Sequence, residues 1–227
     1  MPPRISVIIP AYNEEQSIAS VLNDLPHERL HEIIVVDNCS TDRTAQVARD
    51  HGAKVFEEKR RGYGSACLKG IAMLDHPDIV VFLDGDYSDY PEEISLLLEP
   101  ILAGQKDFVL GSRMIKPASR KALLPQARYG NKLAVFLIRL FFRHQYTDLG
   151  PFRAIRYESL QAIDMQDQDF GWTVEMQIKA VRKKLRIAEI PVSYRERIGV
   201  SKITGTLAGT FQAGTKIIYT IFKYLII

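Results

Sequence analysis

The stretch Ile-Val-Val-Phe-Leu-Asp-Gly-Asp, residues 79–86, decides the fold. Its five apolar residues form a short continuous run, which is typical of a strand buried on both faces of a sheet. The run stops at two carboxylates separated by a glycine. We therefore expect a central strand over 79–83, with Asp84 and Asp86 just beyond its carboxyl end.

Comparable apolar runs lie on both sides of this stretch and alternate with segments of helical spacing. This order is typical of a mainly parallel sheet with helices on both faces. We predict a single Rossmann-like α/β domain over residues 1–205 and an amphipathic helix over 206–227. The expected strands are 5–9, 33–36, 54–57 and 108–110, and the expected helices are 17–25, 41–51, 64–74, 91–103, 157–163, 172–182 and 206–227.

The composition is that of an ordinary globular protein, with 46% hydrophobic and 25% charged residues in a chain of 227. A net charge of +3 is too small to indicate a nucleic-acid partner. Two cysteines, Cys39 and Cys67, and the lack of a charged-then-apolar leader favour a reducing, cytoplasmic compartment. No window reaches the ~18 consecutive apolar residues that a membrane-spanning helix needs.

Polar clusters follow three of the expected strands, at 10–14, 37–40 and 84–86. The carboxyl ends of parallel strands meet at one edge of a sheet, where ligands of such folds bind. Asp84 and Asp86 supply oxygen ligands without cysteine or histidine, which suits Mg²⁺ or Mn²⁺ shared with substrate phosphates. Such an ion would neutralise the charge on a departing diphosphate.

These clusters, in this order, resemble those of family-two glycosyltransferases of the GT-A fold, especially the branch of dolichyl-phosphate or polyprenyl-phosphate mannose and glucose synthases. The resemblance implies a metal-dependent hexosyltransferase that uses a nucleotide-sugar donor and inverts the anomeric centre. It extends over nearly the whole chain and rests on the segments 7–14, 35–44, 84–86, 111–113 and 197–202.

The resemblance also implies roles for individual residues at the donor site. Asp84 and Asp86 would hold the metal and the diphosphate, and Asp37 would contact the base or ribose. The chain departs from the family pattern at Asn38, where a second Asp is frequent, and at Ser88, where this branch often has Gln. The residues implied to bind the donor are Pro10, Tyr12, Glu14, Asp37, Asp84 and Asp86.

A phosphate acceptor is already largely ionised near neutral pH, so it needs little help from a general base. The site must instead hold two anions together, and arginine is the side chain best suited to grip phosphate. Arg113 and Arg128 match phosphate-binding positions of the resembled synthases, and 199–202 resembles their mobile loop. The predicted acceptor-phosphate residues are Arg113, Arg128, Arg195, Arg197, Ser201 and Lys202, with Asp86 and Arg113 taking part in catalysis.

Two C-terminal helices combine cationic and apolar faces. In 128–143, Arg128, Lys132, Arg139 and Arg143 fall on one narrow stripe of an otherwise apolar helix, provided that the glycine at position 130 does not break it. In 206–227, the polar side holds Lys216, Thr220 and Lys223, and the apolar side holds Leu207, Phe211, Ile218, Phe222 and Leu225. Both helices fit either packing on protein or a peripheral position at the cytoplasmic face of the membrane.

Asp148 leaves the acceptor open, because it is the natural general base if the acceptor is a sugar hydroxyl of a cell-envelope glycan or a soluble molecule. It would be structural or orienting if the acceptor is a polyprenyl phosphate. Glu175 would contact the donor sugar or favour the positive end of its helix. A non-catalytic nucleotide-sugar-binding protein is the alternative of a different class. The sequence identifies neither the donor nucleotide and sugar nor the oligomeric state.

Overall fold

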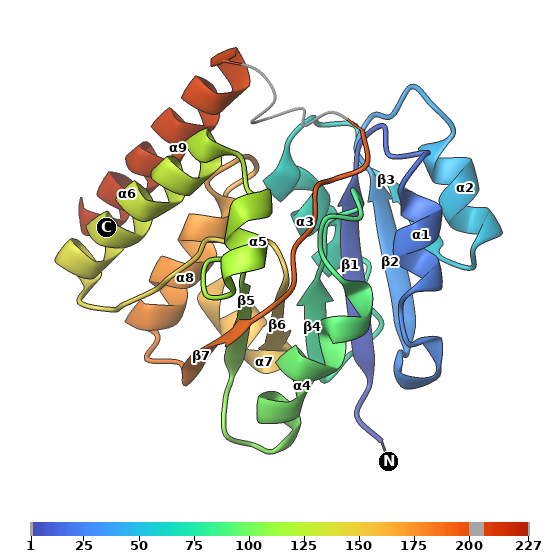
Figure 1. Cartoon of the computed structure of the whole chain (residues 1–227). Coiled ribbons are helices and arrows are strands. Elements are labelled where there is room, and N and C mark those ends of the chain that lie inside the picture. Colours follow the sequence, from blue (N-terminus) through green and yellow to red (C-terminus); the bar gives the residue numbers. More distant parts are fainter. Residues whose placement is uncertain (1, 200–206, 227) are drawn as a thin grey trace.

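The computed structural model describes residues 2–199 and 207–226. A seven-stranded sheet in the order β3-β2-β1-β4-β6-β5-β7 forms the centre, and helices cover both of its faces (Figure 1). All pairings are parallel except those of β6 with β4 and β5. The predicted α/β class with a mainly parallel sheet is therefore confirmed. The strands are β1 Ile5–Ala11, β2 Glu32–Asp37, β3 Lys54–Glu57, β4 Ile79–Phe82, β5 Phe108–Ser112, β6 Arg153–Arg156 and β7 Ile187–Pro191.

The helices connect these strands and complete the two outer layers. Short 3₁₀ turns at His27–Arg29 and Pro91–Glu93 precede β2 and α4. The α-helices are α1 Ile18–Asn23, α2 Thr44–Asp50, α3 Tyr63–Ala72, α4 Ile94–Leu102, α5 Pro117–Ala122, α6 Pro125–Phe142, α7 Tyr157–Ile163, α8 Trp172–Arg182 and α9 Leu207–Ile226.

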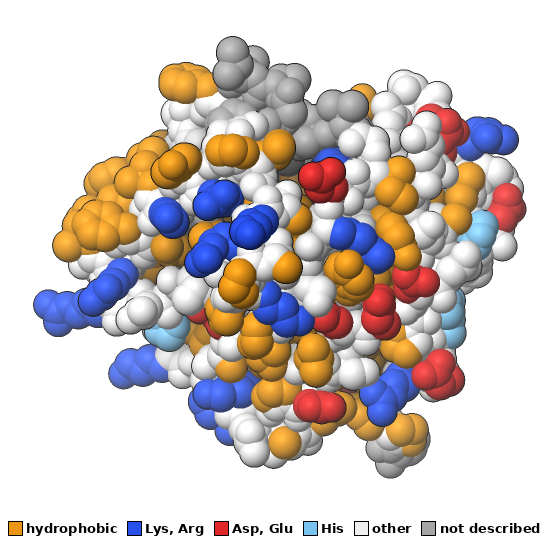
Figure 2. All heavy atoms as spheres, in the orientation of Figure 1, with side chains coloured by type: hydrophobic (Ala, Val, Ile, Leu, Met, Phe, Trp, Pro, Cys, Tyr) orange, Lys and Arg blue, Asp and Glu red, His pale blue; other side chains and the backbone are white. Residues whose placement is uncertain are grey.

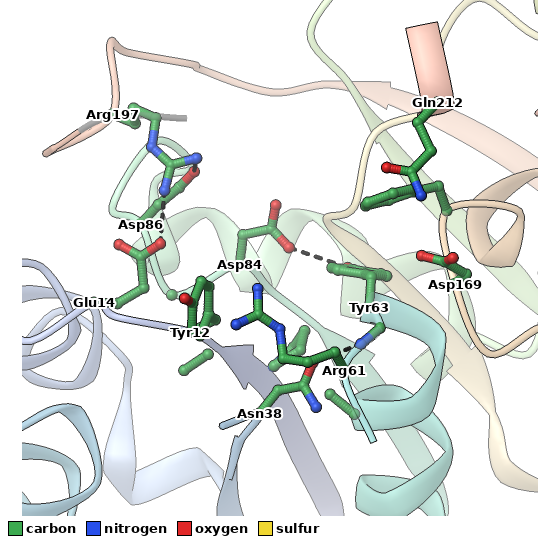
Figure 3. A pocket seen from close by; sticks show the side chains of 16 residues that line it. Tyr12, Glu14, Asn38, Arg61, Tyr63, Asp84, Asp86, Asp169, Arg197 and Gln212 are labelled. Carbon is green, nitrogen blue, oxygen red and sulfur yellow. Dashed lines mark hydrogen bonds and ion pairs between the residues drawn. The ribbon is translucent and has the colours of Figure 1, made fainter. Parts of the chain in front are cut away.

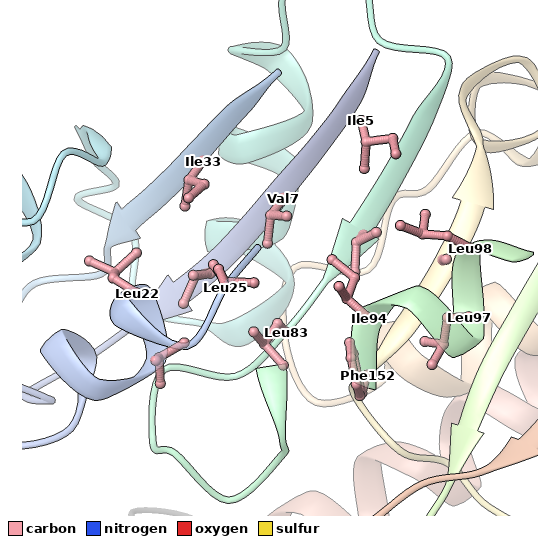
Figure 4. Close-up of a cluster of buried hydrophobic side chains, with 14 of the residues drawn as sticks. Ile5, Val7, Leu22, Leu25, Ile33, Leu83, Ile94, Leu97, Leu98 and Phe152 are labelled. Carbon is pink, nitrogen blue, oxygen red and sulfur yellow. The ribbon is translucent and has the colours of Figure 1, made fainter. Parts of the chain in front are cut away.

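The period of two along each strand divides the apolar core between the faces of the sheet. In β1, Val7 and Ile9 join the cluster beneath α1, α2 and α4 (Figure 4), whereas Ile8 joins the cluster on the other face. Helix α3 packs closely on that second face, and its Gly70 leaves room for the sheet. A Cβ at this position would lie 2.5 Å from the Ile8 side chain. Burial on both faces explains why these strands are continuous apolar runs in the sequence.

Strands β6 and β7 and the short helix α5 were not predicted. The β6 segment begins and ends with arginine, and the Arg153 side chain is fully buried. Its guanidinium donates to the backbone carbonyl oxygens of Gly150 and Thr173, each at 3.1 Å, which satisfies the buried charge. A buried strand held in this way lacks the apolar run by which strands are recognised in a sequence.

Helix α6 runs unbroken through Gly130, so the predicted helix is confirmed and begins three residues earlier than expected. Arg143 lies just outside it, as a left-handed cap with φ 56°. The exposed surface of α6 is both cationic and apolar, because Phe136 and Leu140 are exposed as well as Lys132 and Arg139.

The polar side of α9 faces the protein and part of its apolar side faces outward. Lys216 pairs with Asp167 at 2.9 Å and Thr220 is buried, whereas Phe211 and Phe222 are exposed. Helix α9 packs against α6 and α8. Among the helices of residues 2–199 and 207–226, none combines the length and the apolar character needed to cross a bilayer.

Candidate functional site

A cavity of about 410 Å³ lies at the carboxyl edge of the sheet, where β1, β2 and β4 end (Figure 3). It brings together the predicted donor-site residues Pro10, Tyr12, Glu14, Asp84 and Asp86. The further lining comes from the ends of β1, β2 and β4, the β3–α3 loop, α3, the loop before α8, the β7–α9 connection and α9. These residues are Ala11, Asn38, Arg61, Gly62, Tyr63, Ala66, Gly85, Asp169, Phe170, Arg197 and Gln212.

Asp84, the first carboxylate of the Asp-Gly-Asp motif, is partly buried at the cavity wall. Burial raises the pKa of Asp84 to about 7, with a further contribution from the negative charge of Asp86. The phenol of Tyr63 donates to Asp84 Oδ1 at 3.0 Å and offsets part of this effect. A bound cation would favour the ionised form of this carboxyl.

Asp86 is held from both sides. Its Oδ1 accepts hydrogen bonds from the backbone N–H of Ser88 at 2.9 Å and from the Ser88 hydroxyl at 2.6 Å. Its Oδ2 pairs with Arg197 Nη1 at 3.1 Å, and Arg197 Nη2 also lies 2.6 Å from Glu14 Oε1. Ser88 thus orients Asp86.

The donor set of Asp84 and Asp86 fits a hard divalent cation such as Mg²⁺ or Mn²⁺, since both ligands are carboxylate oxygens. Within the described residues, no group of three or more His, Cys, Asp or Glu side chains could hold a metal. The remaining coordination positions would therefore be filled by water and by donor phosphate oxygens, as is usual for Mg²⁺.

Asp37 and Asn38, the two residues at the end of β2, take different places relative to the cavity. Asn38 lines the cavity, but its Nδ2 donates to the carbonyls of Glu58 and Arg60 at 3.1 and 2.7 Å, and its Oδ1 accepts from Gly62. The amide therefore holds the 58–62 loop in place. Asp37 ends β2 beside the cavity but does not line it.

A second cavity, of about 580 Å³, adjoins the first and shares Tyr63, Asp84, Asp86, Phe170 and Arg197 with it. Apolar and small residues of the α5–α6 region, the loop before β6 and α9 form much of its lining. These residues are Ala122, Leu123, Leu124, Ala127, Gly130, Leu149, Pro151, Ala213, Gly214 and Ile217.

Arg113 is the cation of this second cavity that is fixed most firmly. Its backbone N–H and Nε both donate to Asp148 Oδ2 at 2.8 Å, and its Nη2 donates to Oδ1 at 2.9 Å. Burial alone would lower the pKa of Arg113, but the charge and hydrogen bonds of Asp148 outweigh it and raise that pKa well above its usual value. Arg113 is therefore a permanent positive charge at the cavity wall.

Of the other predicted acceptor residues, some line the second cavity and some do not. Arg195 and Arg197 line the second cavity, and the Arg195 guanidinium stacks on the rings of Tyr87 and Tyr90, 3.5 and 4.0 Å from their centroids. Arg128 is half-exposed on α6 and lines neither cavity. The predictions for Ser201 and Lys202 lie outside the described residues.

Glu175 does not line either cavity, so the structure does not bring it to the donor sugar. Its fully buried carboxylate accepts hydrogen bonds from the backbone N–H of Asp167 at 2.6 Å and from the Tyr224 hydroxyl at 2.6 Å. Glu175 therefore fastens the loop before α8 to helix α9.

Five polar or aromatic residues of the first cavity had no predicted role: Arg61, Tyr63, Asp169, Phe170 and Gln212. The Arg61 guanidinium lies 3.4 Å from the centroid of the Tyr12 ring. These residues come from loops and helices far apart in the sequence and form no local motif. Only the three-dimensional arrangement brings them to one cavity.

Comparison with known proteins identifies relatives over nearly the full length. The family model for glycosyl transferase family 2 matches residues 6–164. An uncharacterised glycosyltransferase of Mycobacterium tuberculosis is 35% identical over 92% of this chain and 94% of its own. A dolichyl-phosphate hexose transferase of Haloferax volcanii is 34% identical, covering 94% and 92%, and an undecaprenyl-phosphate mannosyltransferase of Micrococcus luteus is 31% identical, covering 91% and 90%.

Among solved structures, the glucosyl-3-phosphoglycerate synthase of M. tuberculosis in complex with Mn²⁺, UDP-glucose and phosphoglyceric acid superimposes with a TM-score of 0.76. The match covers 97% of this chain and 80% of that one at 24% identity. At this level of identity the likeness shows the fold, and the predicted GT-A architecture is confirmed.

Proposed function

Because the chain belongs to glycosyl transferase family 2 and is a glycosyltransferase, we propose that it transfers a hexose from a nucleotide-sugar donor to a polyprenyl phosphate. Two relatives have names that include the acceptor, and in both, the dolichyl-phosphate hexose transferase and the undecaprenyl-phosphate mannosyltransferase, it is a lipid phosphate. The observation that carries the proposal is the position of Arg113, a permanently charged, partly buried guanidinium that lines a cavity rich in apolar side chains.

The first cavity suits the donor. Tyr12 and Pro10 would face the nucleoside, and Asp84 and Asp86 would hold a divalent cation at the diphosphate. That cation, when bound, would stabilise the negative charge of the leaving nucleoside diphosphate. The side chains of Asp84 and Asp86 would orient the diphosphate toward the second cavity, which they also line.

The second cavity suits an acceptor that is anionic at one end and apolar along its length. Arg113 and Arg195 would bind the phosphate, and the apolar wall formed by Leu123, Leu124 and Ile217 would contact the first prenyl units. An acceptor phosphate oxygen would then attack the anomeric carbon as the bond to the diphosphate oxygen breaks, which inverts the anomeric configuration. No proton has to leave the phosphate dianion in this step.

A sugar-hydroxyl acceptor is the runner-up, and the surroundings of Asp148 count against it. Asp148 is fully buried, and both of its oxygens are occupied by Arg113 and by the backbone N–H of Leu149. A general base must lie within hydrogen-bonding reach of the proton that it removes. Asp148 instead acts as the residue that positions Arg113.

A soluble phosphate acceptor is the other candidate, because the superimposed synthase binds phosphoglyceric acid. Such an acceptor carries polar groups along its whole length and would require polar partners. Polar residues of the cavity such as Gln126 and Asn131 could serve these groups, but its apolar residues such as Leu123, Leu124 and Ile217 would contact nothing suited to them, whereas they match a hydrocarbon chain.

Apolar side chains on the outer surface of α6 and α9 support delivery of the acceptor from a membrane. Figure 2 shows them gathered at the upper left, with lysine and arginine side chains beside them. Aromatic and aliphatic side chains flanked by cations are typical of a surface that lies in the interface of an anionic membrane. The exposed residues are Tyr129, Leu133, Phe136 and Leu140 of α6 and Phe211, Tyr219, Phe222, Leu225 and Ile226 of α9.

An acceptor panel tests this proposal. The full-length protein is supplied with Mn²⁺ and either UDP-glucose or GDP-mannose, and products are identified by mass spectrometry. We expect a hexosyl phosphate product from undecaprenyl phosphate, and none from undecaprenol, which lacks the phosphate that Arg113 would bind. Faster transfer to 3-phosphoglycerate or to a free sugar than to undecaprenyl phosphate would contradict the proposal.

A further inference from the structure

Asp169 stands on the side of the donor cavity opposite Glu14 and Arg197, next to Gln212 (Figure 3). It belongs to the loop between α7 and α8 and is half-buried. Its place in the cavity is separate from that of the two motif carboxylates, which lie at the end of β4. Besides Asp84, Asp86 and Glu14, the cavity therefore has a fourth carboxylate, to which the metal-binding motif assigns no role.

The Asp169 carboxylate has no hydrogen bond or ion pair to any residue within 2–199 and 207–226, whereas its neighbour Asp167 is fully engaged. Asp167 Oδ1 accepts from the backbone N–H groups of Asp169 and Gly171 at 2.8 and 3.1 Å, and Asp167 Oδ2 pairs with Lys216. Asp167 thus holds the loop, and the Asp169 side chain is left facing the cavity. Because it has no partner among the described residues, this carboxylate is available to accept hydrogen bonds from a ligand or from water.

The loop that carries Asp169 is held firmly against helix α3. The Gln168 carbonyl oxygen accepts from the backbone N–H of Ser65 at 2.9 Å. A Cβ at Gly64 would lie 2.0 Å from the Asp167 carbonyl oxygen, so the backbones approach as closely as glycine allows. This packing fixes Asp169 relative to Tyr63 and Asp84, which suits a group that must orient a ligand.

The position of Asp169 identifies which part of the donor it would meet. A transferred sugar must lie between the donor diphosphate and the acceptor, and hence where the two cavities adjoin. Phe170 lines both cavities, and Asp169 is its immediate neighbour in the donor cavity. Tyr12 and Arg61, at the nucleoside end, come from other elements.

Building on the proposed function, we propose that Asp169 and Gln212 form the subsite for the hexosyl group of the donor. Asp169 accepts hydrogen bonds from the sugar hydroxyls, Gln212 supplies an amide beside it, and Phe170 provides an apolar surface for the ring. Hydrogen bonds to an ionised acceptor are stronger than those between neutral groups, so Asp169 carries most of the discrimination between hexoses. The subsite recognises hexose hydroxyls and contributes nothing to nucleoside binding.

The test compares the binding of a nucleotide sugar with that of its nucleoside diphosphate, measured by calorimetry with Mn²⁺ and without acceptor. UDP-glucose is paired with UDP, and GDP-mannose with GDP, on the wild type, Asp169→Asn and Asp169→Ala. We expect both variants to bind the preferred nucleotide sugar about tenfold or more weakly, the loss typical of a hydrogen bond to a charged group. The affinity for the matching nucleoside diphosphate stays unchanged.

Asp164→Asn is the matched control, because Asp164 is an exposed carboxylate in the same loop and lines neither cavity. It should bind both ligands like the wild type. Equal affinity of Asp169→Ala and the wild type for every nucleotide sugar would overturn the subsite, as would an equal loss of nucleoside diphosphate binding. Because no acceptor is present, a failure of the polyprenyl phosphate assignment leaves this result unaffected.

Discussion

Arg197 Nη1 lies 3.1 Å from Asp86 Oδ2, so an arginine of the β7–α9 connection occupies an oxygen of the Asp-Gly-Asp motif. The backbone N–H of Ile198 also donates to the Asp86 carbonyl oxygen at 3.1 Å, and that of Arg195 donates to the Ser88 carbonyl oxygen at 2.9 Å. The segment 195–198 is therefore fastened along the motif loop. A cation that binds Asp86 through Oδ2 must compete with the guanidinium of Arg197.

Arg197→Gln should therefore bind Mn²⁺ more tightly than the wild type when no nucleotide is present. Removing one positive charge close to the ion and freeing Asp86 Oδ2 both favour the metal, and we expect an affinity gain of about tenfold. Electron paramagnetic resonance of free Mn²⁺ measures it directly. Arg43→Gln, which removes an exposed arginine charge, is the control and should change nothing. Weaker Mn²⁺ binding by Arg197→Gln would show that Arg197 does not compete with the ion.

Asp148→Asn should weaken acceptor binding more than it slows the chemical step. The substitution removes the charge that holds Arg113 in its bidentate geometry, so the KM for undecaprenyl phosphate rises about tenfold while kcat falls less. Loss of a general base would instead lower kcat by about 10²–10⁴-fold. Asp107→Asn breaks another arginine–aspartate pair, with Arg186, at the opposite end of the sheet and controls for lost stability. A collapse of kcat at unchanged KM would assign the base to Asp148.

Phe136→Asp and Leu140→Asp together should abolish binding to anionic vesicles. Both side chains are more than half exposed on α6, so the folded protein tolerates the change while the membrane-facing surface loses apolar area. Sedimentation with vesicles of phosphatidylcholine and phosphatidylglycerol, at low and high salt, measures the effect. Leu102→Asp alters an exposed leucine of α4 and should bind like the wild type. Wild-type protein that stays in the supernatant at low salt would refute the membrane assignment.

Glu32→Gln should lower the free energy of unfolding at neutral pH by about 1.5–3 kcal/mol, the range for a hydrogen bond to a charged group. Burial alone would raise the pKa of Glu32, but hydrogen bonds from Lys54, Asp75 and Ser6 outweigh it and lower that pKa. A lowered pKa means that the stabilisation is present above the unfolded value of 4.5 and is lost as the pH falls below it.

Urea unfolding of the wild type and Glu32→Gln at pH 7 and at pH 3.5 measures this difference. The two curves should differ at pH 7 and approach each other at pH 3.5. Glu28→Gln, at an exposed position, should match the wild type at both values. A gap that stays constant with pH would mean that the ionised carboxylate of Glu32 contributes no stability.

The sequence identified the strands that are buried on both faces, because burial requires continuous apolar runs such as those of β1 and β4. It did not identify β6 and β7. Arg153 of β6 is buried through backbone hydrogen bonds, and β7 is half-buried and contains Glu189. Elements whose charges are satisfied by tertiary contacts leave no periodic signal in the sequence.

The site was predictable where it depends on strand ends and not where it depends on distant loops. Asp84, Asp86 and Glu14 meet at the sheet edge as expected, since parallel strands present their carboxyl ends together. Asp169 and Gln212 reach the cavity only through the packing of α9 and the loop before α8. Asp37 and Arg128, assigned by resemblance, lie outside both cavity linings.

The central claim is that Asp84 and Asp86 hold the divalent cation on which hexose transfer to a polyprenyl phosphate depends. The most direct measurement is the rate of hexosyl undecaprenyl phosphate formation by the wild type, Asp84→Asn, Asp86→Asn and the exposed-site control Glu92→Gln. The account predicts that EDTA stops the wild type and Glu92→Gln, that added Mn²⁺ restores both, and that neither aspartate variant recovers at any Mn²⁺ concentration. Undiminished transfer by Asp86→Asn, or by the wild type in excess EDTA, would contradict it.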